Sequence, residues 1–178
     1  MKEESWRAVN TGLLFFFIFW KLMSNQANKH THKVQTGIVT IEGIEKDYWG
    51  DKPDYDSHLV TTIFRLRKKN LDEFTTEDLR IVIGQNRSLP ILIPLALTVL
   101  EKNILASGHF YSGDLLQNVI TSSPEFWADN PELKDKFKKI FVKNVKKIKG
   151  SGLHERDKKK LFAGYEQFLI GAEVTAFS

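Results

Sequence analysis

The chain has 178 residues, no cysteine, and 26 basic against 22 acidic side chains, for a net charge of +4. This length is enough for one domain with a buried core, and the lack of cysteine excludes disulfides and thiolate metal sites. Charge is uneven: residues 1–70 carry 11 basic and 8 acidic side chains, residues 71–130 carry 3 and 8, and residues 131–178 carry 12 and 6. The net charge therefore does not tell which surface meets a partner.

The N-terminal region contains an apolar run, LLFFFIFW, at residues 13–20. A bilayer-spanning helix needs about 20 apolar residues, so this run is too short to span a membrane well. No small-residue cleavage site follows it, which argues against a secretory signal. We expect residues 1–33 to be an apolar segment and a polar tail, and residues 34–178 to form the domain. The run either docks on the core or precedes a true start at Met23, and membrane contact is the less favoured alternative.

The segment at residues 34–44 reads VQTGIVTIEGI, and its partly alternating, β-branched pattern predicts a short strand or hairpin. Residues 46–57 form a loop by composition, because they contain a glycine, a proline and four aspartates. Residues 58–68 then have the spacing of an amphipathic helix. The predicted apolar stripe consists of Leu59, Thr62, Ile63 and Leu66. The basic side chains expected on the opposite, polar side are Arg65, Arg67 and Lys68.

Further helices are predicted by caps and by apolar faces. Thr75, with Asp78 three residues later, has the spacing of a capping box and predicts a helix from residue 76 to residue 84. Residues 89–100 are apolar on nearly every face and predict a helix buried in the core. It is expected to start near Pro90, with a kink or an irregular first turn because Pro94 lacks an amide donor. Three closely spaced helix starts follow, and their expected N-caps are Ser112, Ser123 and Asn130.

Two longer helices are expected at residues 132–149 and 155–170, where apolar side chains recur at helical spacing. Gly150 and Gly152 separate them. The chain is therefore predicted to be mainly α, a compact single-domain bundle of about six or seven helices, with or without a short N-terminal strand or hairpin.

The loop at residues 46–57 is the main candidate for a binding surface, because aromatic side chains beside charges are frequent interface anchors. A calcium site is disfavoured, since the loop lacks the bidentate glutamate of a calcium-binding loop. A solvated loop is the alternative to partner contact, and Trp49 has the further alternative of filling the core. The candidate contact residues are Asp47, Trp49, Asp51, Asp54, Tyr55 and Asp56, together with Asp72 and Glu73.

No catalytic motif is recognisable in the chain. His30 and His32 form an H-x-H pair, but they lie in a polar, lysine-flanked terminus that is not expected to bind metal. The remaining histidines are His58, His109 and His154, and none lies in a motif of acid–base catalysis. We therefore predict a protein that is not an enzyme, with no metal, no cofactor and no small-molecule substrate.

The segment at residues 108–114 reads GHFYSGD. Ser112 and Asp114 are expected to start a helix. Phe110 and Tyr111 are expected to pack as a hydrophobic staple. We interpret the segment as one that defines the fold rather than one that touches a partner.

The helix at residues 132–149 carries eight lysines, and three more follow at residues 158–160. Such a stripe can neutralise phosphates in a salt-dependent way. The solvated face of a basic amphipathic helix has the same composition, and no base-reading motif or exposed aromatic pattern accompanies the lysines. We favour the solvated face, and a small nucleic-acid-binding protein is the alternative function.

Seven motifs follow one another in the chain: DYWG at 47–50, RKK at 67–69, LDE at 71–73, TEDLRIVIGQ at 76–85, PILIPLAL at 90–97, FYSGDLL at 110–116 and EFWADNPEL at 125–133. Their order resembles that of the immunity proteins of bacterial contact-dependent growth inhibition (CDI) systems. The resemblance covers roughly residues 40–140.

The resemblance implies a cytoplasmic protein that binds the cognate toxic C-terminal domain of a large surface exoprotein in a one-to-one complex and blocks it. Toxins of such systems are often nucleases that act on RNA or DNA. The implied mechanism is occlusion of the toxin's active site or substrate groove, for which an acidic surface can mimic the phosphate backbone. The acidic residues available for this are Asp72, Glu73, Glu77, Asp78 and the aspartates of residues 47–56.

Overall fold

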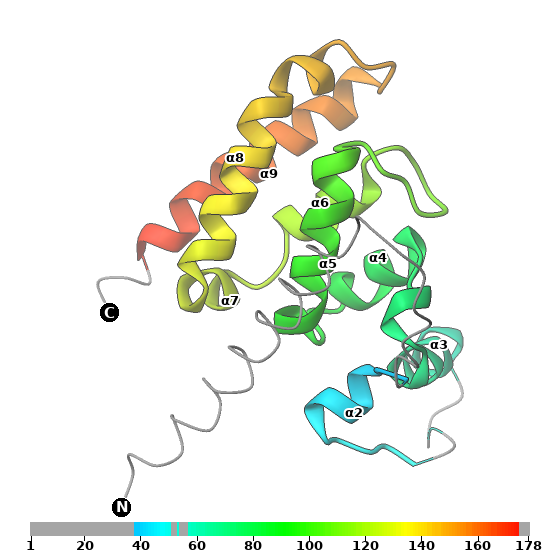
Figure 1. Ribbon diagram of the computed structural model, residues 1–178. Helices are drawn as coiled ribbons and strands as arrows, with labels where there is room; N and C mark the ends of the chain where they lie inside the picture. The colour runs from blue at the N-terminus through cyan, green and yellow to red at the C-terminus, as the bar shows by residue number, and fades with distance from the viewer. Residues whose placement is uncertain (1–37, 51–52, 54–56, 175–178) are drawn as a thin grey trace, which may run out of the picture. The chain divides into compact units, whose positions relative to one another are not determined.

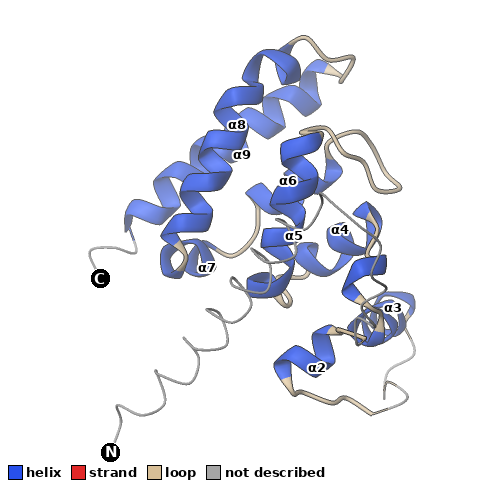
Figure 2. Cartoon of the chain, in the orientation of Figure 1, coloured by secondary structure: helices blue, strands red, loops and turns tan. Residues whose placement is uncertain are grey.

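The structure, a computed structural model, describes residues 38–50, 53 and 57–174, with side chains up to residue 170. In this part the chain forms eight α-helices, one 3₁₀ helix and no strand (Figures 1 and 2). In chain order they are α2 (Ile41–Glu45), α3 (His58–Lys68), η1 (Leu71–Glu73), α4 (Thr76–Gly84), α5 (Leu89–Lys102), α6 (Asp114–Ile120), α7 (Pro124–Asp129), α8 (Pro131–Lys149) and α9 (Glu155–Val174). The predicted mainly α fold is confirmed.

The segment before α3 is helical where a strand or hairpin was predicted. Its described residues make one isolated antiparallel bridge, between Thr40 and Asn70. The side chain of Thr40 accepts a hydrogen bond from the amide of Gly43 (3.0 Å) and caps α2. Ile41 is fully buried. A helix cap and one buried apolar side chain therefore outweigh β propensity at this position, because that propensity depends on packing against a sheet.

The predicted helix starts are confirmed with one shift. Thr75 and Asp78 form the predicted capping box, in which each side chain accepts a hydrogen bond from the other residue's amide (3.2 Å and 2.9 Å). Ser123 caps α7 by accepting from the amide three residues later (3.2 Å). For α6 the capping residue is Gly113 rather than Ser112, since the turn requires a positive φ of 88° that glycine adopts without strain.

The central part of the core is built on α5. Its buried side chains are Leu89, Ile91, Leu92, Ile93, Ala96, Leu97 and Leu100. Helix α4 packs against α5 and α6, and α5 also packs against α8. The helix continues through Pro94, because burial of its apolar side chains outweighs the loss of one amide donor.

The second part of the core is an aromatic cluster between α7, α8 and α9. Its members are Trp127, Phe137, Phe141, Phe162, Tyr165 and Phe168, with ring centroids from 3.7 Å to 6.3 Å apart. The buried indole N–H of Trp127 donates to the hydroxyl of Ser122 (2.9 Å), which satisfies its one polar group. These rings join α8 and α9, which run side by side in Figure 1 (yellow, and orange to red).

The expectations on the N-terminus concern residues outside the described part of the chain. These expectations are the apolar run at residues 13–20, the alternative start at Met23 and the tail that ends at residue 33. Among the described helices, none combines the length and the apolar composition that crossing a membrane requires.

Candidate functional site

Arg67, near the end of α3, is buried, although the apolar stripe of the helix predicts it on the polar side. Its side chain is only 4% exposed. Nη1 donates to the carboxylate of Glu45 (2.6 Å), while Nη2 donates to the carboxylate (3.1 Å) and the main-chain carbonyl (2.7 Å) of Asp47. A buried guanidinium needs such partners, because an unpaired buried charge is strongly destabilising. Arg67 therefore fixes the end of α2 and the residues that follow it against α3.

Trp49 completes this arrangement, which we call the Arg67 cluster (Glu45, Asp47, Trp49, Phe64 and Arg67). Its indole N–H donates to the carboxylate of Asp47 (2.7 Å). The guanidinium carbon of Arg67 lies 4.1 Å from the centroid of the Trp49 ring, a cation–π contact. The ring also packs on Phe64, with 5.1 Å between centroids. Trp49 remains half-buried, so it braces the loop and keeps part of its ring in contact with solvent.

The amphipathic phase of α3 explains why sequence reasoning missed Arg67. Leu59, the first residue of the predicted stripe, is exposed, whereas Thr62 and Leu66 are buried as predicted. Arg67 lies three residues after Phe64 and thus shares with it the face that the loop covers. One feature of the sequence could have indicated the burial of Arg67. It follows Phe64 by one helical turn, and an acidic and aromatic loop precedes the helix.

The predicted contact residues fall into three groups. Asp47 and Trp49 lie together in the Arg67 cluster. Asp72 and Glu73 are exposed on η1, which a main-chain hydrogen bond holds beside the residues that precede α2. The third group lies outside the described residues and consists of Asp51, Asp54, Tyr55 and Asp56.

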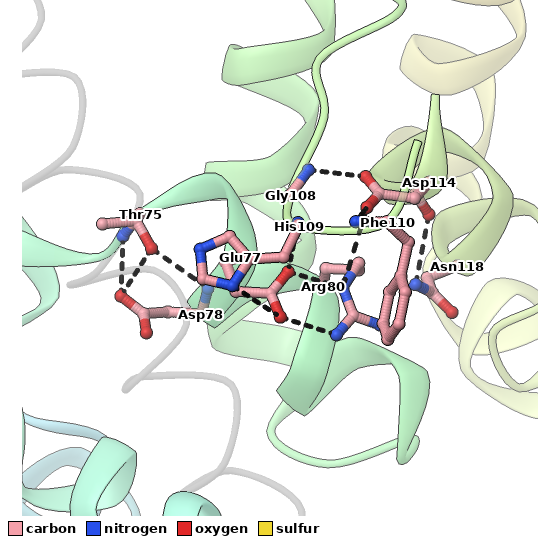
Figure 3. A network of polar contacts seen from close by, with 9 residues as sticks. All are labelled: Thr75, Glu77, Asp78, Arg80, Gly108, His109, Phe110, Asp114 and Asn118. Carbon is pink, nitrogen blue, oxygen red and sulfur yellow. Dashed lines mark hydrogen bonds and ion pairs between the residues drawn. The ribbon is translucent and has the colours of Figure 1, made fainter. Parts of the chain in front are cut away.

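A second polar network, which we call the α4 network, lies at the start of α4 (Figure 3). Arg80 donates two hydrogen bonds of 2.7 Å to the carboxylate of Glu77. The same carboxylate accepts from the amide of His109 (2.9 Å). Asp114, the first residue of α6, is buried and accepts from the amide of Gly108 (2.7 Å). Carboxylates from two helices therefore hold the loop between α5 and α6.

Close packing and charge pairing characterise the α4 network. A Cβ atom on Gly108 would overlap the carboxylate of Glu77, so this approach of the loop requires glycine. The hydrogen bonds from Arg80 are the main reason that the pKa of Glu77 lies below its ordinary value. Burial raises the pKa of Asp78, but hydrogen bonds from Lys69 and from the capping threonine outweigh burial and lower this pKa. Both carboxylates are therefore ionised at neutral pH.

The expected staple of Phe110 and Tyr111 is not formed. Phe110 is 71% exposed, and Tyr111 is exposed as well. The guanidinium carbon of Arg80 lies 4.3 Å from the centroid of the Phe110 ring. The carboxylate of Asp114 accepts from the amide of Phe110 (3.2 Å). The buried position under the loop is thus occupied by a carboxylate that binds the main chain, and the aromatic side chains turn outward.

The described residues offer binding groups rather than a metal site. No three histidine or acidic side chains in this part of the chain are grouped so that they could hold a metal ion. Nδ1 of His109 lies 3.8 Å from the carboxylate of Glu77, and its ring is exposed. The same carboxylate accepts two hydrogen bonds from Arg80.

Both polar clusters lie in the region that a family comparison matches. The family model described as CDI immunity proteins matches residues 43–137, which is more than half of the chain. The chain belongs to the CDI immunity proteins. This confirms the resemblance of the seven motifs. No curated protein and no solved structure matches the chain. In this immunity protein the matched region begins within α2 and ends within α8, so it contains the Arg67 cluster and the α4 network.

Proposed function

We propose that this immunity protein binds the cognate C-terminal toxin domain of a CDI exoprotein in a one-to-one complex, in the cytoplasm, and neutralises it by covering its active site or substrate groove. The observation that carries the proposal is the family match over residues 43–137. The two polar clusters support binding without catalysis, because their charged side chains pair with one another and with the main chain of loops.

We propose the acidic and aromatic residues around α2, α3 and η1 as the contact surface. Tyr48 is 69% exposed, and the carboxylate side chain of Asp47 is 58% exposed. Arg67 holds this segment in one geometry, which lowers the entropy that binding would otherwise cost. Asp72 and Glu73 add exposed negative charge on η1. The sequence assigns four further residues to this surface: Asp51, Asp54, Tyr55 and Asp56.

The toxin that best fits an acidic contact surface is a nuclease. Nucleases bind the phosphate backbone with basic side chains, so their substrate grooves carry positive charge. Exposed carboxylates can take the places of phosphates in such a groove. Electrostatic attraction between the two surfaces would also accelerate association, and salt would weaken this effect.

The proposal is tested by calorimetric titration of the full 178-residue chain against the C-terminal domain of the exoprotein encoded immediately upstream. We expect a one-to-one complex of nanomolar affinity, about −12 kcal/mol, and loss of the toxin's nuclease activity in the complex. No binding to a folded toxin domain would contradict the partnership. Binding that leaves the toxin active would contradict occlusion.

A double substitution tests the contact surface. Asp72→Ala combined with Glu73→Ala is expected to weaken binding by about tenfold, mainly through slower association, because it removes exposed charges. The matched control removes two exposed charges elsewhere, with Asp129→Ala and Glu132→Ala. An equal effect of the two variants would show that net charge, and not the η1 surface, determines affinity.

The exposed lysines of α8 favour nucleic-acid binding as a second candidate function. The exposed members are Lys139, Lys143, Lys146, Lys147 and Lys149. Retention of the protein on RNA or DNA that is lost between low and moderate salt would support this function. Retention that persists after Lys143, Lys146 and Lys147 are replaced by glutamine would exclude the α8 face as the binding surface.

A further inference from the structure

Phe110 is a large apolar side chain that the fold does not bury. Among the described aromatic residues, only Phe110 and Tyr48 are more than two thirds exposed. An exposed phenylalanine contributes little hydrophobic stabilisation to the free protein, because its ring stays in water. Burial of such a ring against a partner releases that stabilisation, and for this reason aromatic residues are enriched among interface anchors.

The main chain that carries Phe110 is held on both sides. Three consecutive amides, those of Gly108, His109 and Phe110, each donate to a carboxylate (2.7 Å, 2.9 Å and 3.2 Å). The acceptors are Asp114 and Glu77, from two different helices. Both carboxylates have low side-chain exposure, so water competes little for these bonds. The loop is therefore preorganised, and its immobilisation adds little to the cost of binding.

The ring itself is also oriented. The guanidinium of Arg80 packs on the Phe110 ring, and two hydrogen bonds to Glu77 fix that guanidinium in turn. A cation over an aromatic ring favours one arrangement of the side chain. The ring is thus supported from the protein side by Arg80, while most of its surface remains exposed.

The charges around the loop indicate the partner's chemistry. Carboxylates approach the loop from three helices: Glu77 of α4, Asp114 of α6 and Asp157 of α9. Burial, and then the charges of Asp114 and Asp157, raise the pKa of Tyr111. Two of these carboxylates lie beside arginines, Glu77 beside Arg80 and Asp157 beside Arg156. The surrounding stretch, residues 71–130, has 8 acidic and 3 basic side chains. A complementary partner therefore carries basic groups around an apolar pocket.

We propose that Phe110 is an anchor that inserts into an apolar, basic-rimmed pocket of the toxin domain. This inference rests on the function proposed above and specifies a second contact, apart in sequence from the acidic residues of the α2 to η1 surface. His109 and Tyr111 flank the anchor and form the rim of the contact. The ordered loop supplies the geometry, and the ring supplies the buried apolar area.

Substitutions of Phe110 in the full chain test the anchor, with the upstream-encoded toxin domain as the probe. Phe110→Ala is expected to weaken binding by about 30-fold or more, measured by calorimetry. The matched control is Val142→Ala, which truncates a similarly exposed apolar side chain on α8 and is expected to change affinity by less than about threefold. Equal affinity of Phe110→Ala and the wild-type protein would overturn the proposal.

Two further variants separate an apolar contact from a charged one. Phe110→Leu keeps an apolar side chain and should retain most of the binding, whereas Phe110→Asp should lose it even though it adds negative charge. Equal binding by these two variants would overturn the anchor. If Phe110→Ala lowers the melting temperature, the comparison of these two variants still tests the anchor, because both lose the contact between the Phe110 ring and Arg80.

Failure of the inference is distinguishable from failure of the proposed function. If the Asp72 and Glu73 double variant loses affinity while all Phe110 variants bind like the wild-type protein, toxin binding stands and the anchor is wrong. If the wild-type chain does not bind the folded toxin domain, the proposed function is wrong and the anchor is wrong with it.

Discussion

The α7–α9 region and the α2–α4 region are held together by different forces. In the first, stacked and edge-to-face rings bury apolar area around Phe137. In the second, a buried arginine and paired carboxylates hold loops to helices. Hydrophobic burial supplies stability with little directional preference. Buried ion pairs add little net stability, since desolvation offsets their attraction, but their geometry is specific. Most of the buried aromatic area thus lies in the first region, whereas the second fixes the geometry of polar side chains and loops.

The largest effect is expected in the aromatic region. Phe137→Ala should lower the free energy of unfolding by about 3–5 kcal/mol, because it removes a fully buried ring and leaves a cavity. Urea unfolding followed by circular dichroism measures this loss. Val142→Ala, on the exposed side of the same helix, is the control. Similar losses for the two variants would show that the aromatic cluster does not dominate stability.

A smaller loss of stability, with a local change in order, is expected for Arg67→Met. The variant keeps apolar volume but removes the charge, and Glu45 and Asp47 are exposed enough to be resolvated. We expect a loss of about 2 kcal/mol and faster hydrogen exchange of the amides of residues 45–49. Arg65→Met, at an exposed position of the same helix, should change neither. Unchanged exchange in Arg67→Met would contradict the assigned role of the cluster.

A third substitution tests the close approach in the α4 network. In Gly108→Ala the new methyl group displaces the carboxylate of Glu77 and breaks its bond to the amide of His109. We expect a loss of about 1 kcal/mol and faster exchange of the amides of residues 108–110. Gly152→Ala is the matched control, because a Cβ there meets no atom within 4 Å. Equal stability of Gly108→Ala and Gly152→Ala would contradict the close packing of the loop on Glu77.

The smallest effect is a dependence on pH. The pKa of Glu77 is lower in the folded chain than its unfolded value of 4.5, mainly because Arg80 donates hydrogen bonds to its carboxylate. Its contribution to stability is therefore fully present above pH 4.5 and is lost as the pH falls through the lower, folded value. The difference in unfolding free energy between wild type and Glu77→Gln should shrink on acidification. A difference independent of pH would contradict this assignment.

The sequence predicts the interactions that are local and misses those that are not. Thr75 and Asp78 are three residues apart, so the capping box could be recognised from spacing alone. Arg67 and Glu45 are separated by 22 residues, and hydrophobic periodicity does not reveal which charged side chain finds a distant partner. The assignment of α2 failed for a related reason, because its helix depends on the burial of one side chain, Ile41, in the core.

The candidate contact surface shows the same division. Composition identified Asp47 and Trp49 as interface candidates, and the structure shows how both are braced, while their contact with a toxin stays a prediction. Phe110 was assigned to the interior because an aromatic residue before a helix start often packs as a staple. The competing interaction is a buried carboxylate 4 residues along the chain, whose choice of main-chain partners sequence spacing does not show.

The carboxylates of Glu77 and Asp114 accept hydrogen bonds from the main-chain amides of residues 108–110. The path of the loop therefore does not depend on what His109, Phe110 and Tyr111 are. We expect these three positions to accept other side chains with little change in the helices, so long as the glycine and the two acidic residues remain. Substitution at the loop tip is therefore expected to change the exposed surface of the protein while the packing of α4, α5 and α6 is kept.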